Sequence, residues 1–306
     1  MKQPLIRYFV VLFIVMQAML SHATNLSLFA DTIPFERTAY NNLLVSAVLN
    51  RVDTVKLMFH TASKDVTLTQ TSLPKLKSIR FDEEVDGVTS WGAASNASRM
   101  SAHNHVQLQG ISWPDLPIWD DVNTGQGADG KLGFGLLEGK VLQLDFDQNL
   151  MVLTDELPLD LSTYQQLPLT FEKGNMFVNI HCSIGGKRLE NRFLIHSGYS
   201  GALLFDDEFG AEHHLDSLLP AVGEKILHDA FGNAIVSKKV VVPRAEIGSY
   251  ELFDVAAGFF KGASGLQRIS ILGADVLKRF NVVIDAQRIF IYIKPSHLIA
   301  MPFTVI

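Results

Sequence analysis

The sequence predicts an all-β protein of two similar lobes with few and short helices. Runs of about four to eight residues rich in Val, Ile, Phe and Tyr are interrupted by Gly, Asn, Asp or Pro, a pattern typical of strands. Two parts of the chain also resemble each other, which indicates a repeated architecture. With 47% hydrophobic and 19% charged residues among 306, the chain is apolar enough to fold. We expect lobes at 33–158 and 167–297, joined by 159–168.

Residues 1–23 are expected to form a secretory signal peptide. Lys2 and Arg7 lead into an apolar run over 8–20, and Ser21 and Ala23 are small residues at the −3 and −1 positions of a cleavage site. The run is shorter than the ~20 residues that a membrane-spanning helix needs, which favours a cleaved signal over an uncleaved anchor. The mature protein is therefore expected to be exported, to a periplasm or the medium, with no membrane span.

Charge and cysteine content exclude several kinds of protein. The formal net charge is −6, so there is no basic excess and no nucleic-acid partner is expected. The single cysteine, Cys182, rules out an intrachain disulfide and a Cys-based metal cluster. It lies in the alternating run 176–182, which predicts a strand with a buried thiol. No Gly-rich phosphate loop or dinucleotide fingerprint occurs, so we expect no cofactor.

The clearer part of the repeat lies late in each half. Each copy is an apolar strand ending at Leu-Gly, with Gly133 or Gly273, followed by a short helix and a β-hairpin. Helices are expected at 135–139 and 275–280, and a further one within 205–219. The aligned segments are 132–137 with 272–277, 141–145 with 281–285, and 151–153 with 291–293.

The other part of the repeat aligns 57–62 with 193–198. In both, an apolar strand runs into a turn of small residues, His60-Thr61-Ala62 in the first half and His196-Ser197-Gly198 in the second. Two copies of one strand and turn predict two equivalent places in the two lobes.

The region 81–125 has no counterpart of equal character in the second half. It is polar and contains all three tryptophans, Trp91, Trp113 and Trp119. Two interpretations stay open. The region is either an irregular surface insertion or a loop that covers a substrate, since long ordered loops are often functional.

Taken together, these segments resemble aspartic proteases of the pepsin and retropepsin type. That family repeats an apolar strand, Asp-Thr/Ser-Gly, a later apolar-apolar-Gly and a small helix, and 129–133 and 271–285 look like the corresponding parts of bacterial retropepsin-like domains. The resemblance implies a bilobal pepsin-like fold of two β-barrel lobes in a single chain. It also implies a monomer, and a cleft between the lobes that binds an extended peptide or protein segment by strand addition.

The sequence departs from the family where its chemistry takes place. In such enzymes each lobe supplies one Asp, and the two carboxylates share a proton. Here His60 and His196 occupy both Asp positions, while Thr61 and Ser197 keep the hydroxyl residues that follow. Ala62 replaces the first of the two glycines.

Three interpretations of the histidine pair remain open. The ancestral peptidase chemistry is lost, or the imidazoles hold a metal, or they hydrolyse a substrate with a bound water. No third metal ligand is assignable nearby, although Asp65 is close in sequence, so no metal is expected. The leading prediction is a peptide- or protein-binding pseudoprotease; the alternatives are an active hydrolase that uses the pair and a structural envelope protein. The residues expected to contact a peptide, besides the two turns' His60, Thr61, His196 and Ser197, are Ala62, Gly198, Tyr199, Gly133, Gly273, Trp91, Trp113 and Trp119.

Overall fold

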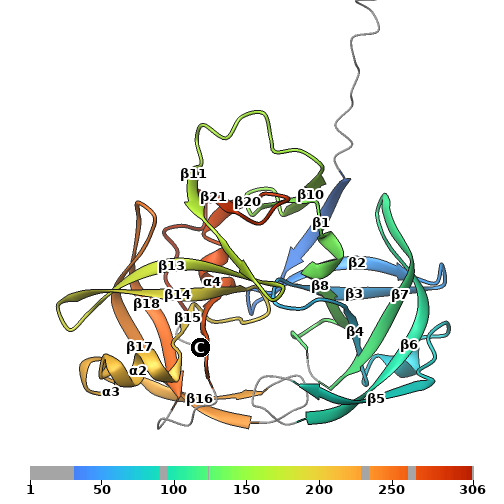
Figure 1. Cartoon of the computed structure of the whole chain (residues 1–306), viewed down its shortest axis with the longest axis horizontal. Helices are drawn as coiled ribbons and strands as arrows, with labels where there is room; N and C mark the ends of the chain where they lie inside the picture. The colour runs from blue at the N-terminus through green and yellow to red at the C-terminus, as the bar shows by residue number, and fades with distance from the viewer. Residues whose placement is uncertain (1–30, 90–94, 123, 229–233, 261–266, 305–306) are drawn as a thin grey trace, which may run out of the picture. The chain divides into compact units, whose positions relative to one another are not determined.

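Strands build most of the protein and the helices are short, as the sequence predicts (Figure 1). The structure is a computed structural model that describes residues 31–89, 95–122, 124–228, 234–260 and 267–304. Residues 31–306 cluster as one compact unit. The expected signal peptide, 1–23, lies outside the described residues. Among the described residues, no helix is long and apolar enough to cross a membrane.

The first half of the unit begins with four strands and a 3-10 turn. These are β1 (Asp31–Arg37), β2 (Leu43–Leu49), β3 (Asp53–His60), β4 (Val66–Thr69) and η1 (Leu73–Lys75). The rest of this half comprises β5 (Glu83–Thr89), β6 (Ser95–Leu108), β7 (Ile111–Asp121), β8 (Gly130–Gly133), the 3-10 helix η2 (Phe134–Leu137), β9 (Val141–Asp145) and β10 (Leu150–Thr154).

The second half follows the same plan. It begins with β11 (Gln165–Pro168), β12 (Thr170–Glu172), β13 (Asn175–Ile184), β14 (Lys187–His196), β15 (Leu203–Leu204), α2 (Asp207–Glu212) and α3 (Leu215–Leu218). It continues with β16 (Gly223–His228), β17 (Ala234–Ile247), β18 (Tyr250–Phe260), β19 (Ser270–Gly273), α4 (Ala274–Leu277), β20 (Phe280–Ile284) and β21 (Phe290–Pro295). Short helices thus occur in the three segments where the sequence predicts them.

Strand pairing repeats between the halves. β3 runs parallel to β8 with His60 opposite Gly133, and β14 runs parallel to β19 with His196 opposite Gly273. These are the strands and turns that the aligned segments single out. The pairing matches because hydrogen bonds between strands depend on the backbone, which both copies share.

The region 81–125 also has a counterpart, which differs from our expectation of an unmatched insertion. It contains the antiparallel series β5, β6 and β7, and the second half contains the series β16, β17 and β18. In both halves the last strand of the series pairs in parallel with the strand after the turn, β7 with β4 and β18 with β15. The side chains of these strands differ between the halves, so the sequence conceals the equivalence.

The two halves share one sheet. Its strands run in the order β1, β10, β9, β20, β21 and β11, and the halves meet where Leu144 of β9 pairs with Val282 of β20. The expected linker 159–168 contributes β11 to this sheet. At the junction, the backbone N–H of Phe146 donates to Oδ1 of Asn281 at 2.7 Å.

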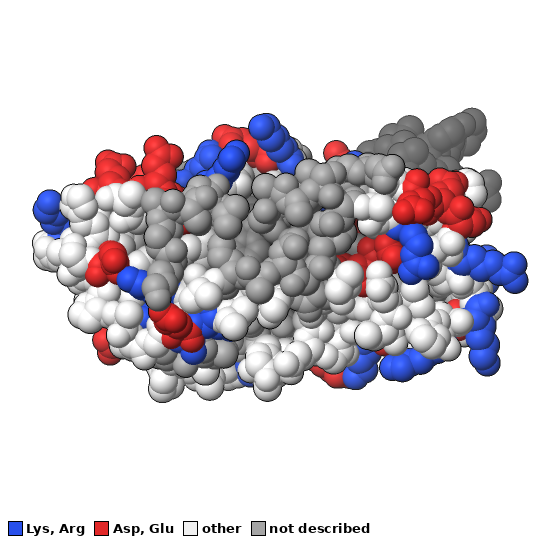
Figure 2. Space-filling model, turned by 90° about the horizontal axis from the view of Figure 1, so that it is seen from below, with Lys and Arg blue, Asp and Glu red and all other residues white. Residues whose placement is uncertain are grey.

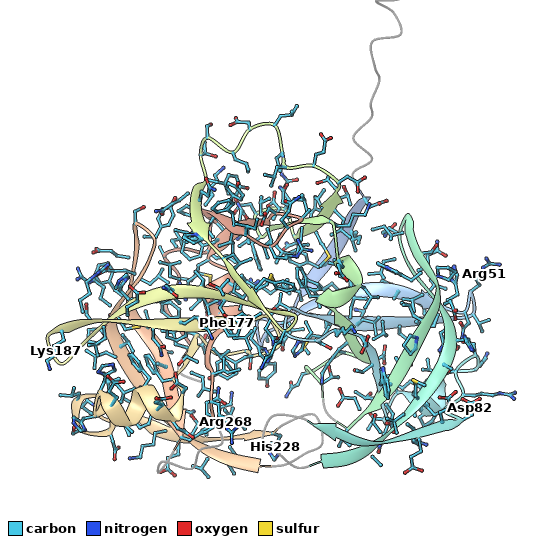
Figure 3. All side chains as sticks on the ribbon, in the orientation of Figure 1. Arg51, Asp82, Phe177, Lys187, His228 and Arg268 are labelled. Carbon is cyan, nitrogen blue, oxygen red and sulfur yellow. The ribbon has the colours of Figure 1, made fainter. Side chains whose placement is uncertain are left out.

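Alternation along β3 and β14 decides where the two histidines point. Leu57 and Phe59 on β3, and Phe193 and Ile195 on β14, are buried in the core. Because successive side chains of a strand point to opposite faces, the histidines at the strand ends face away from the core. Figure 3 labels Arg51, just before β3, and Lys187, at the start of β14, at opposite ends of the unit. The two strands therefore run inward, toward each other.

Figure 2 shows the face on which β5 and β16 lie. On its described part, acidic and basic side chains are mixed and most of the surface is uncharged. β5 and β16 are also terminal strands in the order of their sheets. Each therefore has an edge that no strand of the described residues pairs.

Candidate functional site

His60 and His196 meet at the ends of the two inward-running strands. Their ring centroids are 4.5 Å apart and the ring planes are inclined by 62°. Both side chains are half-buried. The structure therefore brings together the two residues that the sequence alignment of the two halves places at equivalent positions.

Thr61 and Ser197 hold the two turns against each other with four hydrogen bonds. The N–H of Thr61 donates to Oγ of Ser197 at 3.0 Å, and the N–H of Ser197 donates to Oγ1 of Thr61 at 2.9 Å. The two hydroxyls donate in turn to backbone carbonyls, Thr61 to that of Ile195 and Ser197 to that of Phe59, both at 2.7 Å. We call this set of four bonds the cross-brace. Both side chains are fully buried, so the cross-brace fixes the turns without contact with water.

Backbone donors define the protonation of both rings. The N–H of Ala62 donates to Nδ1 of His60 at 3.3 Å, and the N–H of Tyr199 donates to Nδ1 of His196 at 2.9 Å. A backbone N–H can only donate, so each Nδ1 must be the acceptor nitrogen of its ring. In a neutral imidazole the proton then resides on Nε2.

The surroundings keep both imidazoles neutral near pH 7. Burial lowers the pKa of His60 well below its ordinary value, and the neighbouring His196 and the Lys131 ammonium lower it further. Burial, assisted by Lys131, lowers the pKa of His196 to about 4. The pair is thus a neutral, donor-bearing site, in contrast to a carboxylate pair that shares one proton.

Gly198 makes room for the ring of His60. A Cβ at this position would lie 2.4 Å from both Cδ2 and Nε2 of His60, and 3.2 Å from Cε1 of His196. A side chain at 198 would therefore displace the ring. Ala62 occupies the equivalent turn position in the first half and carries a methyl group, so the two turns are not identical in their contacts.

The face of the first half that carries His60 is polar. Strand register places Lys131 beside Met58 and Thr67, and Thr67 beside Trp119. Lys131 forms an ion pair with Asp121, which also accepts a hydrogen bond from Thr67 at 3.2 Å.

The corresponding face of the second half carries an apolar cluster. Leu204, Phe260 and Ile271 form a small buried cluster against which Tyr199 and Leu227 pack. Strand register equates Ile271 with Lys131 of the first half, because each directly precedes the Leu of a Leu-Gly strand end. The two sides of the site therefore offer a ligand different chemistry.

The tryptophans do not form one group. Trp91 lies outside the described residues. Trp113 packs against the hydrophobic core. Trp119 is half-buried on β7, and its indole nitrogen has no hydrogen-bond partner among the described residues.

Gly133 and Gly273 lie opposite the two histidines in the strand pairing. A Cβ at Gly273 would lie 2.1 Å from the backbone oxygen of Gly201 and 2.5 Å from Cδ1 of Tyr199, so this glycine makes room for the turn backbone and for the tyrosine ring.

Two asparagines that sequence analysis missed tie the first half to the second turn. Nδ2 of Asn42 donates to the carbonyl of Ser197 at 3.1 Å and to that of Gly198 at 3.3 Å. Nδ2 of Asn41 donates to the carbonyl of Ser200 at 3.0 Å. They lie in the loop 38–42 between β1 and β2, whereas only 173–174 separate β12 from β13 in the second half, so the repeat contains no signal for them.

A buried ionic cluster, also missed, supports Asn41. Nζ of Lys278 lies 2.7 Å from Oδ1 of Asp275 and donates to Oδ1 of Asn41 at 2.9 Å. Arg279 lies 3.3 Å from the same carboxylate. The sequence did contain a signal for this cluster. Three charged residues fall within the five positions 275–279 of an otherwise apolar segment, and charges in a buried segment require partners.

No group of three or more His, Cys, Asp or Glu side chains that could hold a metal ion occurs in the described part of the chain. Asp65 is half-buried, and burial raises the pKa of its carboxyl group.

Two β lobes, a shared sheet and two facing turns define an all-β, pepsin-like fold. The solved structure of an aspartic proteinase from Irpex lacteus matches with a TM-score of 0.60, over 90% of this chain and 100% of that chain, at 13% sequence identity. A scan against family models finds no match. A search of curated protein sequences finds none either. The structural similarity shows the protease fold.

Proposed function

We propose that this protein is an exported, peptide- or protein-binding pseudoprotease in which a histidine pair replaces the catalytic carboxylates of a tandem retropepsin-like chain. It binds an extended segment between its two lobes as a monomer. Residues 1–23 direct export and are removed, so the mature chain begins at Thr24. The last point is tested by the intact mass of the protein recovered after export.

The hydrogen bonds at Nδ1 carry the proposal. A protease of this fold needs a base that takes a proton from water. Each Nδ1 is already occupied by a backbone N–H, and each Nε2 bears the proton. Neither neutral ring has a free lone pair for water. For a ring to accept a proton from water at Nε2, its own proton would first have to move to Nδ1. That change of tautomer would break the hydrogen bond between Nδ1 and the backbone N–H.

The same geometry supports binding. Two Nε2–H groups are donors suited to a carbonyl or carboxylate oxygen of a ligand. β5 and β16 end their sheets and have unpaired edges among the described residues, so an extended peptide can add to them as a strand. The cross-brace keeps the two turns rigid, which lowers the entropic cost of binding.

One experiment separates binding from catalysis. The purified protein is incubated with a defined peptide mixture from about pH 3 to pH 8, and retained and cleaved peptides are identified by mass spectrometry, beside a His60→Ala/His196→Ala variant. We expect retained peptides and no cleavage. Cleavage that disappears in the variant would instead make the pair catalytic. If no peptide is retained or cleaved, the protein is a scaffold and the proposal fails.

A further inference from the structure

We propose that a pocket beside His196 binds a carboxylate of the peptide ligand through Lys225 and Lys239. The inference rests on the proposed function and deepens it, since it names the ligand as an acidic peptide. The shared chemistry is a carboxylate, supplied either by an Asp or Glu side chain or by the end of a peptide.

The pocket adjoins the histidine pair. Its lining includes Tyr199, Lys225, Leu227, Lys239 and Thr304. Tyr199 connects the pocket to the pair, because its backbone N–H donates to Nδ1 of His196. The histidines themselves do not line the pocket, so we expect a peptide that contacts the pair to reach it past Tyr199.

The two lysines share a face of neighbouring strands. Lys225 on β16 is opposite Ser237 on β17, and Lys239 is opposite Gly223. The lysines are therefore diagonal neighbours two positions apart on one face, within reach of each other's long side chains. Both are half-buried.

Neither lysine has an ion pair or hydrogen bond with a side chain in the described part of the chain. The adjacent Lys238 points to the other face of β17 and is paired with Asp216. Burial lowers the pKa of Lys225, and the positive charge of Lys239 lowers it further. Two like charges in a partly desolvated pocket repel each other, and an anion between them would relieve that repulsion.

The rest of the lining explains why a carboxylate on an organic chain is favoured. Leu227 packs against the apolar cluster of Leu204, Phe260 and Ile271, and Tyr199 packs against the same cluster. The pocket thus combines an apolar wall with two ammonium groups. The methylene groups of a glutamate side chain match the wall, and its carboxylate matches the lysines.

A matched peptide library tests the assignment. The probe is a library of N-acetylated octapeptides with one fixed position, either Glu or Gln, the other positions random, and each made with an amidated or a free C-terminus. We expect wild-type protein to retain Glu peptides over their Gln counterparts by about tenfold, the usual size of one charge-assisted hydrogen bond. If peptides with free C-termini are instead retained over amidated ones, equally for Glu and Gln, the terminal carboxylate is the group that binds.

The variants assign the preference to residues. In Lys225→Met/Lys239→Met we expect the preference to disappear, whereas Lys225→Arg/Lys239→Arg should retain it because the charges remain. Lys238→Met is the matched control and should behave as wild type. Equal retention of all four kinds of peptide by wild type, Glu or Gln with an amidated or a free end, would overturn the acidic preference alone. Retention of no peptide at all would overturn both the preference and the proposed function.

Discussion

The hydroxyls of Thr61 and Ser197 each accept a hydrogen bond from the backbone N–H of the other residue, at 2.9 and 3.0 Å. This reciprocal pair fixes the two turns symmetrically, although the side chains just before them are histidines. The hydroxyl residues that position the turns are thus different from the histidines that would contact a ligand. In this protein two buried hydroxyls fix the turns, and two histidines stand directly before them.

Ser197→Ala should destabilise the protein strongly. The substitution leaves the buried N–H of Thr61 without an acceptor and the carbonyl of Phe59 without this donor. We expect a loss of about 2–4 kcal/mol in the free energy of unfolding, measured by urea denaturation. The control Ser112→Ala, at an exposed strand position, should change it by less than about 0.5 kcal/mol. Similar values for both variants would show that the cross-brace contributes little.

Gly198→Ala should displace the ring of His60. The added methyl group would lie 2.4 Å from Nε2 and Cδ2 of that ring, which is too close for the ring to remain in place. We expect a loss of about 1–3 kcal/mol in stability and a large change in the NMR resonances of His60. In the control Gly210→Ala, the nearest atom to the new Cβ lies at 4.0 Å and the position is helical. That variant should be neutral or slightly stabilising, and unchanged His60 resonances in Gly198→Ala would contradict the described contact.

Stability should fall in mild acid because of the histidine pair. The folded-state pKa of both rings lies below the unfolded value of about 6.5, and that of His196 lies at about 4. Between about pH 4 and pH 6.5 the unfolded state therefore binds more protons than the folded state. The contribution of the two neutral rings to the free energy of unfolding is fully present above about pH 6.5 and is lost as the pH falls toward 4. We expect the melting temperature of wild type to fall more steeply over this range than that of His60→Asn/His196→Asn, which retains side-chain acceptors. Parallel curves would refute the neutral, half-buried state of the rings.

Asp275→Ala should be among the most destabilising single substitutions. It would leave the buried ammonium of Lys278 and the guanidinium of Arg279 without their carboxylate. Breaking such a buried pair costs about 3–5 kcal/mol. The control Glu172→Ala breaks the exposed ion pair with Arg192 and should cost about 1 kcal/mol or less. Thermal unfolding of both variants measures the difference, and equal losses would mean that burial does not strengthen the cluster.

The fold was predictable from the sequence because the repeat preserves strands and turns. Alignment of 57–62 with 193–198 was sufficient to place the two histidines in equivalent turns, and the structure brings their rings together. The role of β5, β6 and β7 was not predictable, because strand pairing depends on the backbone while the side chains of these strands differ from those of β16, β17 and β18.

The detailed chemistry of the site was beyond sequence reasoning for a different reason. Which ring nitrogen carries the proton depends on the N–H groups of Ala62 and Tyr199, which have the same backbone chemistry in any turn. Asn42 reaches the second turn from a loop more than 150 residues away in the chain. Contacts of this kind arise from the folded geometry and leave no local pattern.

The most direct test of the account is the ¹⁵N chemical shifts of the imidazole nitrogens at pH 7. The protein is labelled at its 10 histidines, and the resonances of His60 and His196 are assigned with the single Asn variants. We expect an unprotonated Nδ1 and a protonated Nε2 in both rings, as the backbone donors require. A proton on Nδ1 of either ring, or an imidazolium, would leave the pair with the base or acid that a hydrolase needs and would contradict the proposed function.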